Sequence, residues 1–179
     1  MKSTDKNRLT QSSESFFKTL RTWHIALVVG VVLFLSISTY PVESGGFGED
    51  EDLNNALLYI APLMAMAGIF ASRFMFNKRR ESLQTATTLQ EKTEGYQAAV
   101  IVRWALIEGP TFFSVIAFML TSNYVFGEIA FLMLVYLFLQ RPNLESALED
   151  LNLNHADFDK VRNPESIIFD SSKNKHETE

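Results

Sequence analysis

Four long apolar runs dominate the pattern of hydrophobic and polar positions along the chain. They cover residues 23–40, 56–74, 98–120 and 124–140, and each is apolar around the whole helix rather than along one face. At about 1.5 Å per residue such runs reach roughly 25–35 Å, close to the thickness of the hydrocarbon core of a bilayer. This pattern favours membrane spans over the buried helices of a soluble protein. We therefore predict an all-α integral membrane protein, a four-helix bundle made of two transmembrane hairpins.

The segments around the runs predict how the helices end and pair. Pro41 and the glycine-rich residues 45–48 end the first run. Only residues 121–123 separate the third run from the fourth, and a link this short forces an antiparallel helical hairpin. Small residues that suit close helix contact form a stripe in the second run: Ala61, Ala65, Gly68 and Ser72.

Lysine and arginine residues lie on one side of the predicted spans. Those that precede the first run are Lys2, Lys6, Arg8, Lys18 and Arg21. Residues 78–80, after the second run, are Lys-Arg-Arg, whereas the loop between the first two runs has only acidic charges. Loops rich in these cations stay in the cytoplasm. We therefore predict a multi-pass protein of the cell inner (plasma) membrane with both termini cytoplasmic.

The first run also admits a second interpretation, as a cleaved signal peptide. A basic leader precedes it, and Ser36 and Ser38 have the small-residue spacing of a cleavage site. Against cleavage, the leader is long and the apolar run exceeds the usual ~7–15 residues. We expect a retained span, with cleavage as the alternative.

The predicted transmembrane domain, residues 23–140, is flanked by a cytoplasmic leader. This leader, residues 1–22, is polar until the apolar side chains of residues 16–20, which suit a short interfacial helix continuous with the first span. Between the second and third spans, residues 81–97 contain good helix formers and no proline. We expect them to form a stalk in the cytoplasm.

The cytoplasmic tail, residues 141–179, is predicted to begin with one short helix capped by Asn143. Apolar residues share one face of this helix: Leu144, Ala147, Leu148 and Leu151. The polar end of the tail, from Asp170, has the composition of a disordered segment.

Composition and charge exclude several classes of function. The 179-residue chain has no cysteine, which excludes disulfides and thiolate chemistry, and its net charge of -5 argues against general nucleic-acid binding. The sequence contains no phosphate-binding glycine loop and no Gly-x-Ser-x-Gly elbow. Its histidines, His24, His155 and His176, are too scattered for a paired metal motif. We therefore predict no enzyme activity, no cofactor, no metal site and no nucleic-acid partner.

Two polar clusters have both a structural and a functional interpretation. The acidic residues 49–52 lack the alternating spacing and the closing glutamate of a calcium loop, so a solvated loop is preferred over a cation site. His155, Asp157 and Asp159 are residue types that bind metals. Short polar clusters of this kind are common in loops, so a surface turn is the preferred interpretation.

Glu108 is the most informative residue because it falls near the middle of the third run. Ten residues correspond to roughly 15 Å, which places it near the bilayer centre, where an ionised carboxylate is costly. Burial there favours the neutral acid, which can act as a protonatable group or as a hydrogen-bond donor. Thr111 lies on the same face one turn later. Glu108 and Thr111 are therefore the candidate ion-binding or proton-handling residues.

Two prolines are predicted to break the backbone ladder at membrane depth. Pro110 displaces the carbonyl group of Leu106, and Pro62 does the same to Leu58. Two helix breaks and a carboxyl group can form a polar pocket near the midplane, as in the ion sites of membrane transporters.

A structural role for these residues is the alternative. A buried Glu108 can bond to Thr111, Ser114 or a freed carbonyl and hold the bundle together. No second titratable group lies at the depth of Glu108. Arg103 stands about 140° around the helix from Glu108, so the two side chains do not pair within an ideal helix. We expect Arg103 to extend to the cytoplasmic headgroups beside Trp104.

Residues 105–117, around Glu108, resemble the outer helix of the rotor-ring c subunit of rotary ATP synthases, in which a mid-membrane carboxylate follows a short Ala-x-x pattern. This resemblance covers one hairpin and implies that Glu108 corresponds to the ion-binding carboxylate. The Gly-x-Gly pattern of the family's inner helix is absent, and the central loop is longer here. As a whole, the chain resembles the uncharacterised small four-helix inner-membrane proteins of bacteria, a resemblance that implies no activity.

Two hypotheses for function follow from the sequence. The first is a non-enzymatic structural or accessory subunit in the lipid bilayer, with a protein partner or a second copy bound through the membrane helices and the cytoplasmic tail. The second is a small proton or cation conductor that uses Glu108.

Overall fold

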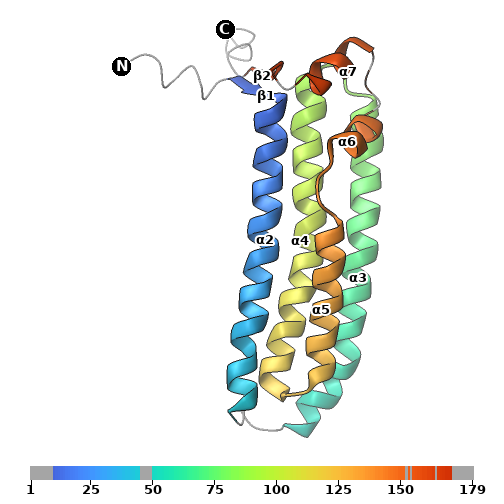
Figure 1. The fold of residues 1–179 in the computed structure, drawn as a ribbon. Coiled ribbons are helices and arrows are strands. Elements are labelled where there is room, and N and C mark those ends of the chain that lie inside the picture. The colour runs from blue at the N-terminus through green and yellow to red at the C-terminus, as the bar shows by residue number, and fades with distance from the viewer. Residues whose placement is uncertain (1–9, 45–49, 152, 154, 164, 171–179) are drawn as a thin grey trace, which may run out of the picture. The chain divides into compact units, whose positions relative to one another are not determined.

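The structure, a computed structural model, describes residues 10–44, 50–151, 153, 155–163 and 165–170. Helices and strands follow one another in the order β1 (Thr10–Ser12), α2 (Ser13–Glu43), α3 (Glu51–Gln84), α4 (Leu89–Thr121), α5 (Tyr124–Leu139), α6 (Leu144–Leu151), α7 (His155–Arg162) and β2 (Ile167–Asp170) (Figure 1). The chain divides into two compact units. The apolar unit is Trp23–Phe76 with Ile101–Arg141, and the polar unit is Met1–Thr22 with Asn77–Val100 and Pro142–Glu179.

The prediction of a helical chain with several membrane-length helices is confirmed. Helices α2, α3 and α4 are each long and apolar enough to cross a membrane. Helix α5 has 16 residues and reaches this length only together with α6, from which it is bent by 74°. The fourth predicted span is therefore shorter than the other three.

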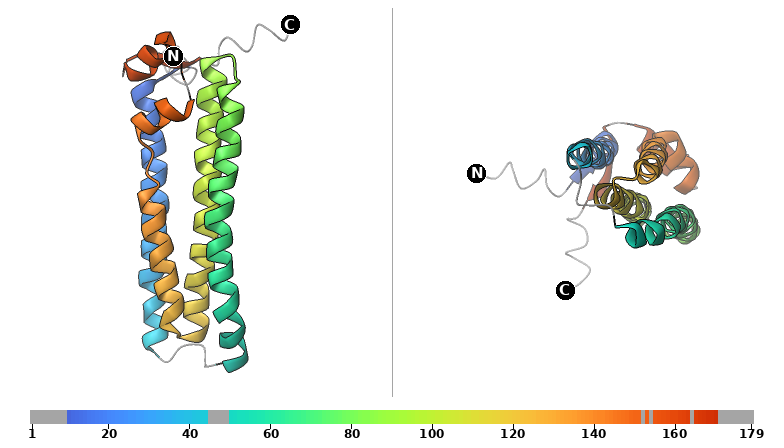
Figure 2. Two further views of the ribbon diagram at one scale, coloured as in Figure 1. Left: turned by 90° about the vertical axis from the view of Figure 1, so that its right-hand side faces the viewer. Right: turned by 90° about the horizontal axis from the view of Figure 1, so that it is seen from below.

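In the apolar unit, segments of α2, α3, α4 and α5 lie side by side, as the end-on view in Figure 2 shows. Helix α4 is the most enclosed, because 44% of its most apolar stretch is buried, against 17% for α2. One cluster of buried side chains consists of Val42, Leu57, Ala61, Ala117, Phe118 and Phe126. Large apolar side chains also cover the outside of the unit, for example Ile37, Phe70, Ile116 and Leu132. An apolar exterior of this extent is expected when lipid surrounds the helices.

Helix α3 meets α4 along the predicted stripe of small residues. All members of this stripe are buried: Ala61, Ala65, Gly68 and Ser72. A methyl group on Gly68 would lie 2.6 Å from the carbonyl oxygen of Leu106 and 2.7 Å from Cγ of Pro110. Such distances are shorter than van der Waals contact, so glycine alone lets the two backbones come this close.

In the polar unit, the end of α3 and the beginning of α4 form a helical stalk joined by residues 85–88. Leu83 of α3 packs on Gly95 of α4, where a Cβ atom would collide with the leucine side chain. The predicted stalk is therefore built from two helices rather than from an extension of the third run alone.

The tail folds against this stalk. Helix α6 follows Asn143, as predicted, and two residues of its apolar face are buried, Ala147 and Leu151. Arg80 Nη1 donates a hydrogen bond to Asp150 Oδ1 at 3.3 Å. Lys92 Nζ donates to the carbonyl oxygen of Leu151 at 3.3 Å. Part of the leucine face expected to bind a partner is thus used within the chain.

A two-stranded antiparallel ribbon was not expected from the sequence. Strand β1 pairs with β2 so that Thr10 lies opposite Asp170. Beside the ribbon, the Ser13 backbone N–H donates to the carbonyl oxygen of Ser166 at 3.0 Å, and Ser13 Oγ donates to that of Val161 at 2.5 Å. These bonds connect the start of α2 to the segment after α7.

Two local expectations for the tail were wrong. Residues 155–159, expected to form a surface turn, begin helix α7, and Asp170, expected to be disordered, belongs to β2. Strand β2 forms by pairing with β1 near the other end of the chain, and a local polar pattern does not reveal such a partner. The rest of the predicted disordered end, residues 171–179, lies outside the described residues, as do residues 1–9 of the leader.

The substitution Gly68→Ala tests the close contact between α3 and α4. We expect it to lower the free energy of unfolding by about 1–3 kcal/mol, because the methyl group must displace the Leu106 carbonyl or the Pro110 ring. The matched control is Gly30→Ala, where a methyl group meets nothing within 4 Å and should be neutral or stabilising. Unfolding in mixed micelles, followed by circular dichroism, measures both variants. Equal stability of the two would contradict the contact.

Candidate functional site

Helix α4 carries Glu108 midway along its apolar stretch. The side chain is partly buried, and none of the described residues forms a hydrogen bond with its carboxyl group. Exposed residues flank it on the same helix: Val102, Ala105 and Gly109. The carboxyl group therefore lies at the border between the buried and the exposed face of α4.

Thr111 is fully buried and does not bond to Glu108. Its hydroxyl group donates to the carbonyl oxygen of Ile107 at 2.7 Å, one turn earlier in α4. Ser114 is equally buried and donates to the carbonyl oxygen of Pro110 at 2.9 Å. Both hydroxyl groups are thus satisfied within their own helix, so the expected bonds from Glu108 to Thr111 or Ser114 are not formed.

Neither predicted helix break interrupts its helix. Helix α3 continues through Pro62, and α4 continues through Pro110. The carbonyl group of Leu106, which Pro110 displaces, lies against Gly68. Pro62 is six residues from Gly68, or ~9 Å along α3. Pro62 therefore lies more than one helical turn from the point where α3 meets Pro110, and a joint pocket of the two prolines with Glu108 stays a prediction.

Two ring nitrogens bind the C-terminal end of α5, a contact that the sequence analysis missed. His24 of α2 is 3% exposed, and its Nε2 lies 2.9 Å from the carbonyl oxygen of Leu137. Trp104 of α4 is 0% exposed, and its indole N–H donates to the carbonyl oxygen of Gln140 at 3.1 Å. The centroids of the His24 and Trp104 rings are 5.0 Å apart. The last carbonyl groups of a helix are short of partners within it. Trp104 supplies a donor to the Gln140 carbonyl, and His24 adds a second partner to the Leu137 carbonyl, which also accepts from the Gln140 backbone N–H at 3.0 Å.

The two residues expected at the headgroups, Arg103 and Trp104, have other surroundings. Trp104 belongs to the core, and the Arg103 guanidinium lies over the ring of Phe76, 4.6 Å from its centroid. A cation over an aromatic face is a favourable arrangement in an apolar setting. A sequence signal for the α5 contact did exist, because His24 and Trp104 each stand near the start of an apolar run.

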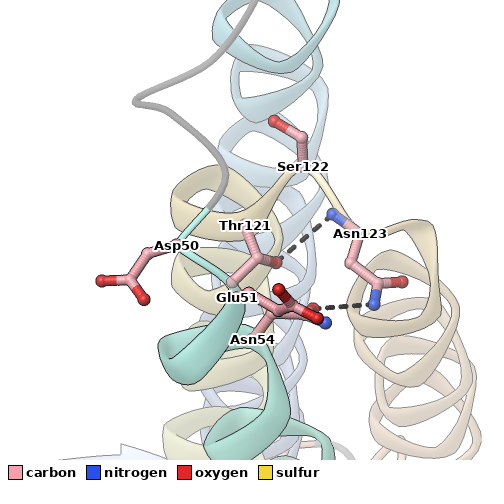
Figure 3. A pocket seen from close by; sticks show the side chains of 6 residues that line it. All are labelled: Asp50, Glu51, Asn54, Thr121, Ser122 and Asn123. Atoms are coloured by element: carbon pink, nitrogen blue, oxygen red, sulfur yellow. Dashed lines mark hydrogen bonds between the residues drawn. The ribbon is translucent and has the colours of Figure 1, made fainter.

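A polar pocket of about 460 Å³ lies where α3 begins and the α4–α5 hairpin turns (Figure 3). Its lining residues are Asp50, Glu51, Asn54, Thr121, Ser122 and Asn123. Asp50 Oδ1 accepts a hydrogen bond from the backbone N–H of Leu53 at 3.0 Å. Asn123 Oδ1 accepts from Val125 N at 3.0 Å, and its Nδ2 donates to Asn54 Oδ1 at 2.8 Å. These bonds cap α3 and α5 and tie the two helix starts together.

The acidic run is therefore partly helical instead of being a solvated loop throughout. Glu51 and Asp52 form the first turn of α3, where negative charge is favoured by the helix dipole. Glu49 lies outside the described residues. Within the described part of the chain, no three His, Asp or Glu side chains come together as a metal site.

The chain matches no known protein family, no curated protein and no solved structure.

Removal of the indole N–H tests the contact at the end of α5. Trp104→Phe should lower the free energy of unfolding by about 0.5–1.5 kcal/mol, because the partly buried Gln140 carbonyl loses the indole donor. Trp23→Phe is the control, since Trp23 is 45% exposed and its change should stay within about 0.5 kcal/mol. The two variants also separate the fluorescence of the chain's two tryptophans. Acrylamide should quench Trp23 more strongly than Trp104, and the reverse order would contradict the burial.

Proposed function

We propose that the chain is a four-span inner-membrane protein, with two hairpins and cytoplasmic termini, that acts as a non-enzymatic structural or accessory subunit of a larger membrane assembly. The membrane-length helices α2, α3 and α4 support insertion. The basic residues around the predicted spans support the orientation. Helix α5 covers only ~24 Å, and we assign it as the fourth span because the cation Arg141 follows two residues after its last residue, Leu139.

The observation that carries the subunit proposal is the incomplete burial of Glu108. Ionisable side chains at membrane depth almost always face protein or water, because contact with lipid tails is costly. Within this chain the carboxyl group is only partly buried, and the described residues leave it without a hydrogen bond. A helix from another protein, or from a second copy, supplies the missing contact in the proposed assembly.

The surface beside Glu108 suits such a helix. Ala105 and Gly109 are exposed and stand four residues apart, the spacing at which small residues let two membrane helices approach closely. A methyl group on Gly109 would meet nothing within 4 Å, so the space there is open. Glu108 at the edge of this surface provides a hydrogen-bonding group for the partner.

The competing hypothesis is a proton or cation conductor centred on Glu108. It is supported by the midway position of the carboxyl group in α4 and by the resemblance to the rotor-ring helix. Against it, Thr111 and Ser114 donate their hydroxyl hydrogens within α4 rather than to Glu108, and the described residues hold no group of three or more acidic or histidine side chains suited to a cation.

Single cysteines test the proposed topology, since the chain has none of its own. In intact cells a membrane-impermeant maleimide should label Asp52→Cys, which is exposed at the start of α3. The same reagent should label Ser82→Cys, exposed in the stalk, only after the membrane is opened. The two sites serve as controls for each other. Labelling of both in intact cells, or the reverse pattern, would contradict the orientation.

The role of Glu108 is tested with Glu108→Leu, which removes the hydrogen-bonding group, and with the control Glu128→Leu, which removes an exposed carboxylate of α5. The subunit proposal predicts a Glu108-specific loss of about threefold or more in the stability of the native assembly, because an interhelical hydrogen bond is worth about 0.6–1.7 kcal/mol. Native gel electrophoresis of gently solubilised membranes measures this. In proteoliposomes, the wild-type chain should show no proton or sodium flux above that of Glu108→Gln.

Carbodiimide labelling gives a second readout of the same question. If sodium or raised pH protects Glu108 from modification by the carbodiimide, the result would favour the conductor and contradict the subunit proposal. An unchanged assembly in Glu108→Leu would contradict the proposed partner contact.

A further inference from the structure

We propose that a cleft at the start of α2 binds the phosphate-bearing headgroup of an anionic phospholipid, an inference that rests on the proposed membrane location. The cleft has a volume of about 760 Å³ and lies within the polar unit. Its lining residues are Ser13, Glu14, Phe17, Lys18, Arg21, Leu144, Val161 and Arg162. It combines a cationic rim with an apolar floor.

The cationic rim comes from two helices that are distant in sequence. Lys18 and Arg21 stand on α2, one turn apart, and Arg162 ends α7. All three side chains are exposed, and none of them forms an ion pair with a described residue. Among the described residues, Glu14 is the one carboxylate in the lining, so their side chains give the cleft an excess of positive charge. Such a site attracts a phosphate group, which Arg can bind through two parallel hydrogen bonds.

The apolar floor distinguishes this cleft from a patch of cations on the surface. Val161 is almost completely buried, and Phe17 and Leu144 are partly buried. A free phosphate ion makes no use of these side chains. A phospholipid has glycerol and acyl carbons next to its phosphate, and these can pack on apolar side chains. The lining therefore fits an amphiphilic ligand better than an inorganic anion.

Hydrogen bonds hold the two sides of the cleft together. Ser13 is 2% exposed and bonds to the Val161 carbonyl oxygen through its hydroxyl group and to that of Ser166 through its backbone N–H. Arg162 therefore follows directly on a residue that is fixed to the first turn of α2. This arrangement reduces the conformational entropy lost when a ligand binds.

The position along α2 suits a lipid headgroup. Arg21 and Lys18 precede Trp23, the first residue of the predicted span, by ~3 Å and ~8 Å along the helix axis. Trp23 is exposed, as is typical of tryptophan at a membrane interface. Basic pockets on the cytoplasmic side of membrane helices are well suited to anionic lipid headgroups.

Native mass spectrometry of the full chain in neutral detergent, titrated with phosphatidylglycerol, tests the proposal. The wild-type chain should retain this lipid, and Arg162→Gln should bind it about fivefold more weakly, as expected for one cation lost at a lipid surface. Arg162 is far from the predicted spans in sequence, so its loss does not affect the orientation. The control, Arg79→Gln, removes an exposed cation of the stalk that does not line the cleft and should bind as the wild type does.

Further binding measurements identify the ligand, and a folding control accompanies them. Phosphatidylcholine should bind more weakly than phosphatidylglycerol, and millimolar inorganic phosphate should not displace the lipid. Displacement by phosphate would show a free-anion site and overturn the assignment to lipid, as would equal effects of Arg162→Gln and Arg79→Gln. Circular dichroism verifies folding, and Lys18→Gln replaces Arg162→Gln if that variant unfolds. Alkaline extraction of cell membranes tests membrane insertion separately, so a failure of the proposed location can be distinguished from a failure of the lipid site.

Discussion

The close approach of α3 and α4 at Gly68 is the contact on which the apolar unit depends. Lipid tails are as apolar as the side chains of these helices, so burial of apolar surface contributes little to helix association in a bilayer. Dispersion contacts between closely packed atoms contribute instead, and they decline steeply with distance. Gly68 allows the backbone of α3 to reach Leu106 and Pro110 of α4. This contact holds Leu106 and Pro110, both partly buried, against α3.

The orientation of α4 then separates its polar side chains into satisfied and unsatisfied groups. Thr111 and Ser114 bond to carbonyl oxygens of their own helix, and Trp104 bonds to the end of α5. Glu108 has no such bond among the described residues. The hydrocarbon core of a bilayer holds no water, so each of these groups needs a hydrogen-bond partner within protein. A polar group left unpaired there costs several kcal/mol of free energy. The carboxyl group is therefore the point at which we propose that a partner helix makes contact.

In the polar unit the ribbon and the two short helices have a comparable role. The pairing of β1 with β2 and the bonds of Ser13 bring the end of α7 to the start of α2, although the two segments are far apart in sequence. Only this arrangement places Arg162 beside Lys18 and Arg21. The proposed lipid site and the proposed subunit surface belong to different units and involve different side chains, so each proposal stands independently of the other.

The sequence alone determined the features that depend on neighbouring residues. Uninterrupted apolar runs predicted the membrane-length helices, and the spacing of Ala61, Ala65, Gly68 and Ser72 predicted a close helix contact. Helix spacing placed Glu108 and Thr111 on one face, whereas the structure places one at a border and the other in the core. The core position of Trp104 and the strand pairing were decided by the tertiary structure alone. Each depends on a partner far away in the chain, and local periodicity carries no information about which distant segments meet.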